Sequence, residues 1–239
     1  MPRFFVNVED ENNIIITGDD ARHIGRSLRM KLGDAITVTC KGTDYNCTIK
    51  SISDEIVTLN LIDKHICKSE PSVKLILFQA IPKGDKFETI LQKSIELGAS
   101  EIVPVLTRRC VSRPTEKDFS KKLKRYEKIS ESASKQSGRG IIPKVHNMVT
   151  LDKAIDMMKS NDLNYILYEN GGERFSAERL KDVKTIGVFI GSEGGFDLEE
   201  VEKVKSNGGV PIWLGERILR CETAPLSAIT IIMHLTGNM

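Results

Sequence analysis

The chain of 239 residues has few cysteines and histidines, the residues that form disulfides or bind metals in small proteins. Its five cysteines are odd in number and widely scattered, and no two of them form a C-x-x-C pair. Its four histidines share no spacing typical of metal ligands. We therefore expect reduced, mostly buried thiols, without a disulfide framework, a zinc site or another metal cofactor.

Long apolar runs are also missing from the sequence. No segment approaches the roughly 20 consecutive apolar residues that a membrane span needs. The N-terminus reaches Glu9 and Asp10 before the core of a signal peptide can form. With 40% hydrophobic and 28% charged residues, the composition is that of a globular protein rather than a disordered chain. These features predict a cytoplasmic protein with no membrane partner.

The net charge of +2 hides an uneven distribution. Residues 1–70 hold 9 basic and 11 acidic side chains, and residues 145–239 hold 10 and 14. Residues 108–144, in contrast, hold 12 basic and only 4 acidic side chains. Such a concentration of positive charge attracts a polyanion, and nucleic acid is the first candidate. The alternative for the lysines in this stretch is a solvated helix face.

The first 70 residues have the pattern of short strands separated by turns. The expected strands cover residues 3–7, 14–17, 35–40, 45–52 and 56–62. The polar stretch 64–72, which contains Pro71, is expected to be a linker. The pattern predicts a small β-barrel domain over residues 1–70.

Strands and helices alternate in the remaining chain, residues 71–239. The expected strands cover residues 73–78, 101–106, 165–168, 185–190 and 210–214. The expected helices cover residues 86–97, 117–135, 151–159, 176–180, 198–206 and 225–235. Alternation of this kind is typical of crossover units and predicts an α/β domain with a mostly parallel sheet.

A glycine-rich loop, Ile-Gly-Ser-Glu-Gly-Gly-Phe-Asp at residues 190–197, joins an expected strand to an expected helix. Ligands of parallel sheets bind beyond the carboxyl ends of the strands, but the spacing is neither G-x-G-x-x-G nor a P-loop. Asp197 and Glu200 form a capping-box pattern, and Glu193 and Glu199 add further negative charge that would repel a phosphate. The loop suits a neutral or cationic ligand held by backbone groups, or else it is only a tight turn.

A second loop, residues 214–225, follows the next expected strand. Thr223 suits the N-cap of a helix and Pro225 its first turn. The helix that follows is apolar nearly all round, so we expect it to be buried or to lie at a subunit interface. Arg217 and Arg220 flank an Ile-Leu pair in this loop, where the alternative is two ordinary surface arginines.

The two loops together, Ile-Gly-x-Glu-Gly-Gly-Phe and then Leu-Gly-x-Arg-Ile-Leu-Arg-x-Glu-Thr-Ala, closely resemble one enzyme family. It is the RsmE family of SPOUT enzymes, the bacterial 16S ribosomal RNA uridine-N3 methyltransferases. Further matching segments lie at residues 2–5, 23–34, 83–86, 92–98 and 136–139, so the resemblance covers essentially the whole chain. Ser192 departs from the proline commonly found there, but backbone contacts to a ligand do not require that side chain.

The resemblance implies a PUA-like RNA-binding barrel over residues 1–70 and a SPOUT domain with a deep trefoil knot over residues 71–239. It also implies a homodimer that methylates N3 of a specific uridine on the assembled small ribosomal subunit. The methyl donor would be S-adenosylmethionine, whose cationic sulfonium agrees with the acidic loop. The implied cofactor-binding residues are Ile190, Gly191, Gly194, Gly195, Leu214, Gly215, Ile218, Leu219, Thr223 and Ala224.

Methylation at N3 requires an unpaired, extruded base, removal of the N3 proton and no metal. As hypotheses, Arg139 stabilises a uridinate through O2 or O4, and Glu222 orients the base or accepts its proton. The alternative is a salt bridge that merely holds the loop. The expected RNA-binding residues are Arg22, Arg26, Arg29, Arg108, Arg109, Arg113, Lys135, Gln136, Arg139, Arg217 and Arg220.

Two other functions stay open from the sequence alone. One is a ribose 2′-O methyltransferase, or a transfer RNA methyltransferase, of the same superfamily. The other is an RNA-binding ribosome assembly factor that keeps the fold but not the catalysis. The intact glycine loops and the Arg-Ile-Leu-Arg-x-Glu-Thr-Ala string weigh against a non-catalytic protein.

Overall fold

The computed structural model describes residues 1–239, which form two compact units. The first unit comprises Met1–Glu70 together with Ser134–Ile142, and the second comprises Pro71–Ala133 together with Pro143–Met239. Residues 134–142 were predicted to belong to the second domain. The structure instead packs this segment with the first unit, where it is bonded to residues that lie far away in the sequence.

A curled, mostly antiparallel sheet forms the first unit. Its five strands follow the order β1-β3-β4-β5-β2, and their bounds are β1 (Arg3–Phe5), β2 (Ile14–Thr17), β3 (Ala35–Cys40), β4 (Thr43–Ile52) and β5 (Ile56–Ile66). Only β1 and β3 run parallel. The register of β4 against β5 shifts at two places, and such bulges bend a sheet. The result is a half-barrel around an apolar core that includes Phe4, Ile36 and Val57.

Two features of the first unit differ from the sequence-based prediction. A short helix α1 (Gly18–Arg22) and a π-helical turn (His23–Ser27) follow β2. They pack on the core through Ala21 and Ile24, which are fully buried. Segments this short carry too few apolar residues to show a helical period. The expected linker at 64–72 is also partly wrong, because β5 continues to Ile66 through pairing with the start of β4.

The second unit contains the parallel sheet that the alternating pattern predicts. The strand order is β12-β10-β11-β6-β7-β8, with β9 also paired to β7, and every pairing is parallel. The bounds are β6 (Lys74–Ala80), β7 (Glu101–Leu106), β8 (Lys144–Val145), β9 (Val149–Thr150), β10 (Leu163–Leu167), β11 (Thr185–Ile190) and β12 (Gly209–Ile212). The two-residue strands β8 and β9 were not predicted.

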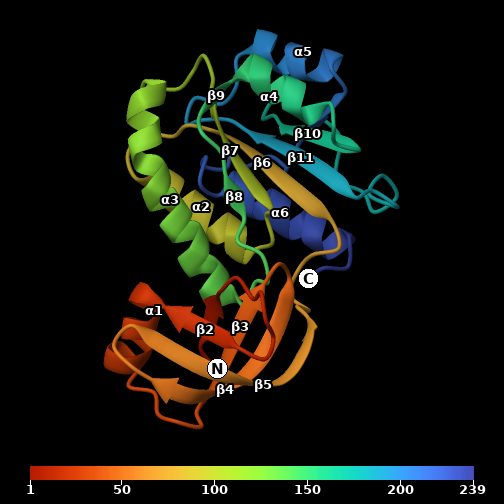
Figure 1. The fold of residues 1–239 in the computed structure, drawn as a ribbon. Coiled ribbons are helices and arrows are strands. Elements are labelled where there is room, and N and C mark those ends of the chain that lie inside the picture. Colours follow the sequence, from red (N-terminus) through yellow and green to blue (C-terminus); the bar gives the residue numbers. More distant parts are fainter. The chain divides into compact units, whose positions relative to one another are not determined.

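Helices cover both faces of this sheet, and Figure 1 shows their arrangement. Leu75 and Leu77 of β6 pack in one apolar cluster with α2, α3 and α6, whereas Ile76 and Phe78 pack in a second cluster with α4 and α5. The helix bounds are α2 (Lys86–Glu96), α3 (Glu116–Ser137), α4 (Leu151–Met158), α5 (Leu198–Ser206) and α6 (Ala224–Leu235). None of these helices is long and apolar enough to cross a membrane.

One predicted helix, residues 176–180, is wrong. The segment forms turns, in which the amide of Leu180 donates to the carbonyl oxygen of Ala177 at 3.2 Å. Leu180 is the single buried residue of the five, so the segment has no apolar face to hold a helix against the sheet. The prediction of mostly buried thiols is confirmed, since all five cysteines are unpaired and all but Cys40 are buried.

Candidate functional site

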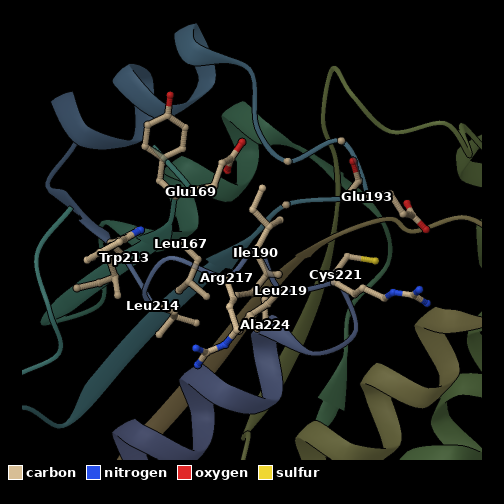
Figure 2. A pocket seen from close by; sticks show the side chains of 18 of the residues that line it. Leu167, Glu169, Ile190, Glu193, Trp213, Leu214, Arg217, Leu219, Cys221 and Ala224 are labelled. Atoms are coloured by element: carbon tan, nitrogen blue, oxygen red, sulfur yellow. The ribbon is translucent and has the colours of Figure 1, made fainter. Parts of the chain in front are cut away.

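A cavity of about 500 Å³ opens at the carboxyl ends of β10, β11 and β12. The three strands are neighbours in the parallel sheet, so the loops that leave them converge at one edge. This volume lies within the range of about 300–1,000 Å³ that is typical of small-molecule binding sites. The cavity is lined by residues 167–169, 190–195 and 212–221, with Lys86 and Ala224. Both predicted loops therefore contribute to one cavity (Figure 2).

Glycines shape the first loop into a tight turn against the cavity. Gly195 has a φ of +67°, and its amide donates to the carbonyl oxygen of Ser192 at 2.9 Å. A Cβ on Gly191 would lie 2.8 Å from the carbonyl carbon of Gly195, and a Cβ on Gly195 would lie 2.9 Å from a carboxylate oxygen of Glu169. Gly191 has no room for a side chain because its neighbour is backbone, whereas at Gly195 the Glu169 side chain could move but the positive φ would strain any other residue. The loop therefore presents bare backbone to the cavity.

The capping box predicted at the start of α5 is confirmed. The amide of Glu199 donates to the Asp197 carboxylate at 3.1 Å, and the amide of Asp197 donates to the Glu200 carboxylate at 3.0 Å. The Arg108 guanidinium pairs with both Asp197 and Glu199. Because carboxylates already accept hydrogen bonds from the amides at this end of α5 and place negative charge there, the helix end offers no site for a phosphate.

Helix α6 begins at the predicted place, but Thr223 does not cap it through its side chain. The backbone of Thr223 is already helical, with φ −91° and ψ −39°, and its hydroxyl makes no capping bond. The amides of Thr223 and Ala224 donate instead to the carbonyl oxygen of Arg220, at 2.8 and 2.9 Å. Thr223 is also the one predicted cofactor-binding residue that does not line the cavity; the other nine do.

A cluster of charged side chains lies at the rim of the cavity. The Glu193 carboxylate accepts hydrogen bonds from the Lys83 amide and from the Lys86 Nζ, each at 3.0 Å. The same Lys86 Nζ lies 3.4 Å from a carboxylate oxygen of Glu222, which also accepts a bond from the Cys221 thiol at 3.2 Å. We call Lys86, Glu193 and Glu222 the rim cluster. It joins the second loop, the glycine loop and the start of α2.

The rim cluster is fixed in its charged form at neutral pH. Burial raises the pKa of Glu193, but its own backbone amide, Lys86 and the Lys83 amide outweigh this effect and lower that pKa. Burial likewise opposes ionisation of Glu222, but the Cys221 thiol and Lys86 hold its pKa below the usual value. The hydrogen bond to Glu193 raises the pKa of Lys86. Burial, with the bond to Glu222, raises the pKa of Cys221 to about 12, so that the thiol stays neutral.

Several cavity residues were missed by the sequence analysis. Leu167, Tyr168 and Glu169 come from the end of β10, and Trp213 follows β12. Figure 2 shows Trp213 and Leu214 on one side of the cavity, opposite Glu193 and Cys221. These residues reach the cavity because β10 lies between β11 and β12 in the sheet. The sequence gives no signal for that strand order.

The two hypothesised catalytic residues, Arg139 and Glu222, belong to different units. Arg139 is only 3% exposed, and its Nε and Nη2 each donate to the Glu70 carboxylate at 2.9 Å. The same carboxylate accepts the amides of Gly140 and Ile141, at 2.7 and 3.0 Å. In this structure Arg139 therefore holds residues 134–142 in the first unit.

The arginines expected to bind RNA in the second unit are exposed but also hold loops. Arg109 donates to the carbonyl oxygen of Gly194 at 3.0 Å, and Arg113 donates to that of Thr107 at 2.9 Å. Arg108 pairs with the carboxylates at the start of α5, as described above. Arg217 and Arg220 lie on the cavity rim, and the Arg220 side chain is 82% exposed.

Acidic partners accompany most of the basic residues expected to bind RNA in the first unit. Arg22 pairs with Asp19, and Arg26 pairs with Asp54 at 2.9 Å. Lys135 pairs with Asp20 at 3.1 Å and lies over the ring of Phe4. Arg29 and Gln136 are exposed. This pairing agrees with the excess of acidic side chains in residues 1–70.

Comparison with known proteins shows similarity to RNA methyltransferases along the length of the chain. A family model described as an RNA methyltransferase domain matches residues 68–233, and one described as an RNA methyltransferase PUA domain matches residues 16–62. The chain is 33% identical to the ribosomal RNA small subunit methyltransferase E of Bacillus subtilis, over 99% of this chain and 97% of that protein. It is 32% identical to the protein of the same name from Buchnera aphidicola, over 100% and 95% of the two chains.

Solved structures match over the same length. The ribosomal RNA small subunit methyltransferase E from Neisseria gonorrhoeae, bound to S-adenosyl methionine, superposes with a TM-score of 0.85 at 29% identity, covering 98% of each chain. A methyltransferase from Legionella pneumophila, in complex with the bound cofactor SAM, also superposes with a TM-score of 0.85 at 27% identity. This second match covers 97% of this chain and 96% of that one.

Proposed function

Because this chain belongs to the ribosomal RNA small subunit methyltransferase E family, we propose that it methylates N3 of a specific uridine in 16S ribosomal RNA, with S-adenosylmethionine as the donor. The observation that carries the proposal is the single cavity formed by the two loops. The resemblance implies that the donor binds between these two loops, and both of them line the same cavity.

The cavity fits the proposed donor in size, backbone and charge. Gly191 and Gly195 leave bare backbone on one wall, where a Cβ on Gly191 would collide with the backbone of Gly195. The lining as a whole is balanced in charge, with Glu169, Glu193 and Glu216 against Lys86, Arg217 and Arg220. Glu169, beside the glycine loop, is the carboxylate that would favour a cation locally, because Glu193 is paired with Lys86. The donor would supply a methyl group on a positively charged sulfur, which needs no further activation. The residues that would hold it are those of the loops at 190–195 and 214–219, with Ala224.

Glu222 is the residue of the second unit that we propose acts on the N3 hydrogen. The N3 atom lies on the pairing edge of uracil, so the base must leave its stack to reach the cavity. The lowered pKa keeps Glu222 ionised at neutral pH, so its carboxylate can accept a hydrogen bond, but it also makes Glu222 a weak base. We therefore favour a role in which Glu222 orients N3–H and passes the proton to water. The role of Arg139 stays a hypothesis, and its burial against Glu70 counts against direct contact with a base.

The exposed arginines of the second unit would supply most of the RNA affinity, with Arg22, Arg26 and Arg29 adding orientation. The small ribosomal subunit is the proposed partner, which places the enzyme in the cytoplasm.

A homodimer and a trefoil knot remain predictions from the family. The exposed or half-exposed apolar residues Ile218, Leu226, Ile231 and Leu235, in and beside α6, support the dimer.

Mapping the methyl group tests the proposal. The purified protein and labelled donor are incubated with naked 16S RNA, small subunits, whole ribosomes and transfer RNA, and nuclease fragments are analysed by mass spectrometry. We expect one N3-methyluridine in 16S RNA. A ribose methyl or a methylated transfer RNA would contradict the proposed specificity. Calorimetric absence of donor binding would indicate an assembly factor without catalysis.

A further inference from the structure

The segment Lys83–Lys86 resembles the family but received no role from the sequence. In the structure Lys86 is the first residue of α2, where the helix dipole disfavours a cation. Its ammonium is held there by carboxylates from two other loops, Glu193 at 3.0 Å and Glu222 at 3.4 Å. Its side chain is 36% exposed and lines the cavity. A cation is thus fixed beside Glu222, at a helix end that does not favour it.

The N3 reaction needs such a cation. When uracil loses its N3 proton, the negative charge spreads over O2 and O4, the two oxygens that flank N3. A donor placed at one of these oxygens stabilises the anion and lowers the pKa of N3. Glu222 alone works against this step, because a carboxylate beside a forming anion repels it. The positive charge of Lys86 offsets that repulsion.

We propose that Lys86 is a catalytic residue whose ammonium donates to O2 or O4 of the extruded uracil while Glu222 receives the N3 hydrogen. The inference rests on the proposed function of the cavity. On entry of the base, Lys86 keeps its bond to Glu193 and exchanges its longer contact with Glu222 for the uracil oxygen. The charged and titratable groups that face Lys86 are Glu193, Glu222 and Cys221, with Arg220 behind Glu222 at 4.0 Å.

The step balances in atoms and charge. The N3–H bond breaks and its proton passes through the Glu222 carboxylate to water. An N3–carbon bond forms as the carbon–sulfur bond of the donor breaks, and the sulfur keeps that electron pair. The products are N3-methyluridine, the neutral thioether and one proton, and Lys86 returns to Glu222 with its own proton retained.

Single-turnover rates over a range of pH test the role of Lys86. The variants are Lys86→Met, Lys86→Arg and, as a matched control on the same helix, Lys93→Met, which removes an exposed ion pair with Glu96. Near neutral pH we expect Lys86→Met to lose about 100-fold or more, the size found when one donor to a developing oxyanion is removed. The loss should shrink as the pH rises, because alkali deprotonates N3 without help. Lys86→Arg should be intermediate and Lys93→Met unchanged.

Glu193→Gln separates this role from a structural one. The substitution weakens the tie between Lys86 and the glycine loop but leaves the ammonium beside Glu222. Because Glu193 also lines the donor cavity and orients Lys86, its variant is assayed at saturating donor. If Lys86 acts on the base, Glu193→Gln lowers the rate much less than Lys86→Met does. If Glu193→Gln reproduces the full loss and the pH profile of Lys86→Met although the ammonium is still present, the lysine acts by holding the loop, and the proposal is overturned.

Binding provides a readout that does not depend on turnover. With S-adenosylhomocysteine present, the affinity is measured for target RNA that carries either uridine or 5-fluorouridine, whose N3 is more acidic. The wild type should prefer the fluorinated RNA several-fold, increasingly as the pH rises, and Lys86→Met should lose this preference. Fluorescence of Trp213, the only tryptophan, reports whether each variant still binds S-adenosylhomocysteine.

The outcomes distinguish the two levels of inference. If the wild type forms no N3-methyluridine, the proposed function fails and the role of Lys86 fails with it. If the wild type forms N3-methyluridine and Lys86→Met keeps both the rate and the pH profile, only the role of Lys86 is overturned. A Lys86→Met loss that is the same at every pH, with the 5-fluorouridine preference intact, overturns it as well.

Discussion

Two ionic clusters of this molecule have opposite characters. In the first unit, Glu70 accepts four hydrogen bonds from Arg139 and the two following amides, and the Arg139 side chain is 4% exposed. In the rim cluster of the second unit, Lys86 is shared between two carboxylates that are 30% and 25% exposed. The first cluster is saturated and closed, whereas the second can exchange a contact with a ligand. The difference indicates that charge at a matching family position does not by itself mark a catalytic residue.

Removing each cation should give the largest contrast between the clusters. Arg139→Met removes two charged hydrogen bonds from the Glu70 carboxylate, which is 19% exposed and keeps the Gly140 and Ile141 amides, so we expect a cost of about 1.5–3 kcal/mol of unfolding free energy. Lys86→Met removes a solvent-exposed pair and should leave the free energy of unfolding nearly unchanged. Denaturant unfolding of the whole chain measures both values.

The double variant Arg139→Met/Glu70→Gln provides the control, because it removes the unpaired charge and should recover part of the loss. Equal costs for Arg139→Met and Lys86→Met would break the distinction between a closed and an open cluster. A folded Glu70→Gln enzyme that loses methyl transfer at unchanged stability would restore a catalytic role for Arg139.

A side chain on the glycine wall should close the cavity. Gly195→Ala must displace the Glu169 carboxylate, 2.9 Å from the new Cβ, and adds the strain of a positive φ, so we expect the affinity for S-adenosylmethionine to fall about 10-fold, or about 1.4 kcal/mol. Quenching of Trp213 fluorescence measures the affinity. Gly237→Ala is the matched control, because it has a φ of +71° but open space around its Cβ. Equal affinity in both variants would mean that the glycine wall does not hold the donor.

The smallest expected effect concerns RNA affinity. Replacing Arg108, Arg109 and Arg113 together by glutamine should reduce the slope of log affinity against log salt by about 2, at roughly 0.7–0.9 per lost phosphate contact. The comparison variant replaces Lys121, Lys122 and Lys124 of α3, where we expect a smaller change. An unchanged slope in the arginine variant would contradict this assignment. Donor binding must be checked in parallel, because Arg109 also holds the glycine loop.

Much of the fold could be predicted from local patterns. Leu75 and Leu77 pack on one face of the sheet, and Ile76 and Phe78 pack on the other. A continuous apolar run therefore indicates a strand that is covered on both faces. The capping box at Asp197 was predictable because its bonds join residues only two and three positions apart. Features of this kind depend on neighbours in the sequence.

Long-range features could not be predicted from the residues alone. Residues 134–142 join the first unit through bonds to Glu70, and no local pattern marks a partner 69 residues away. The place of β10 between β11 and β12 brings Glu169 and Trp213 to the cavity, but strand order is set by packing of the whole sheet. The rim cluster likewise joins Lys86 to residues more than 100 positions later.

The central claim is that one cavity between the two loops holds the methyl donor. A crystal structure of this protein grown with S-adenosylmethionine tests it most directly. We predict density for the donor against the backbone of Gly191, Gly194 and Gly195 on one side and of Leu214, Gly215 and Leu219 on the other. Donor density elsewhere on the protein, with both loops vacant, would contradict the account.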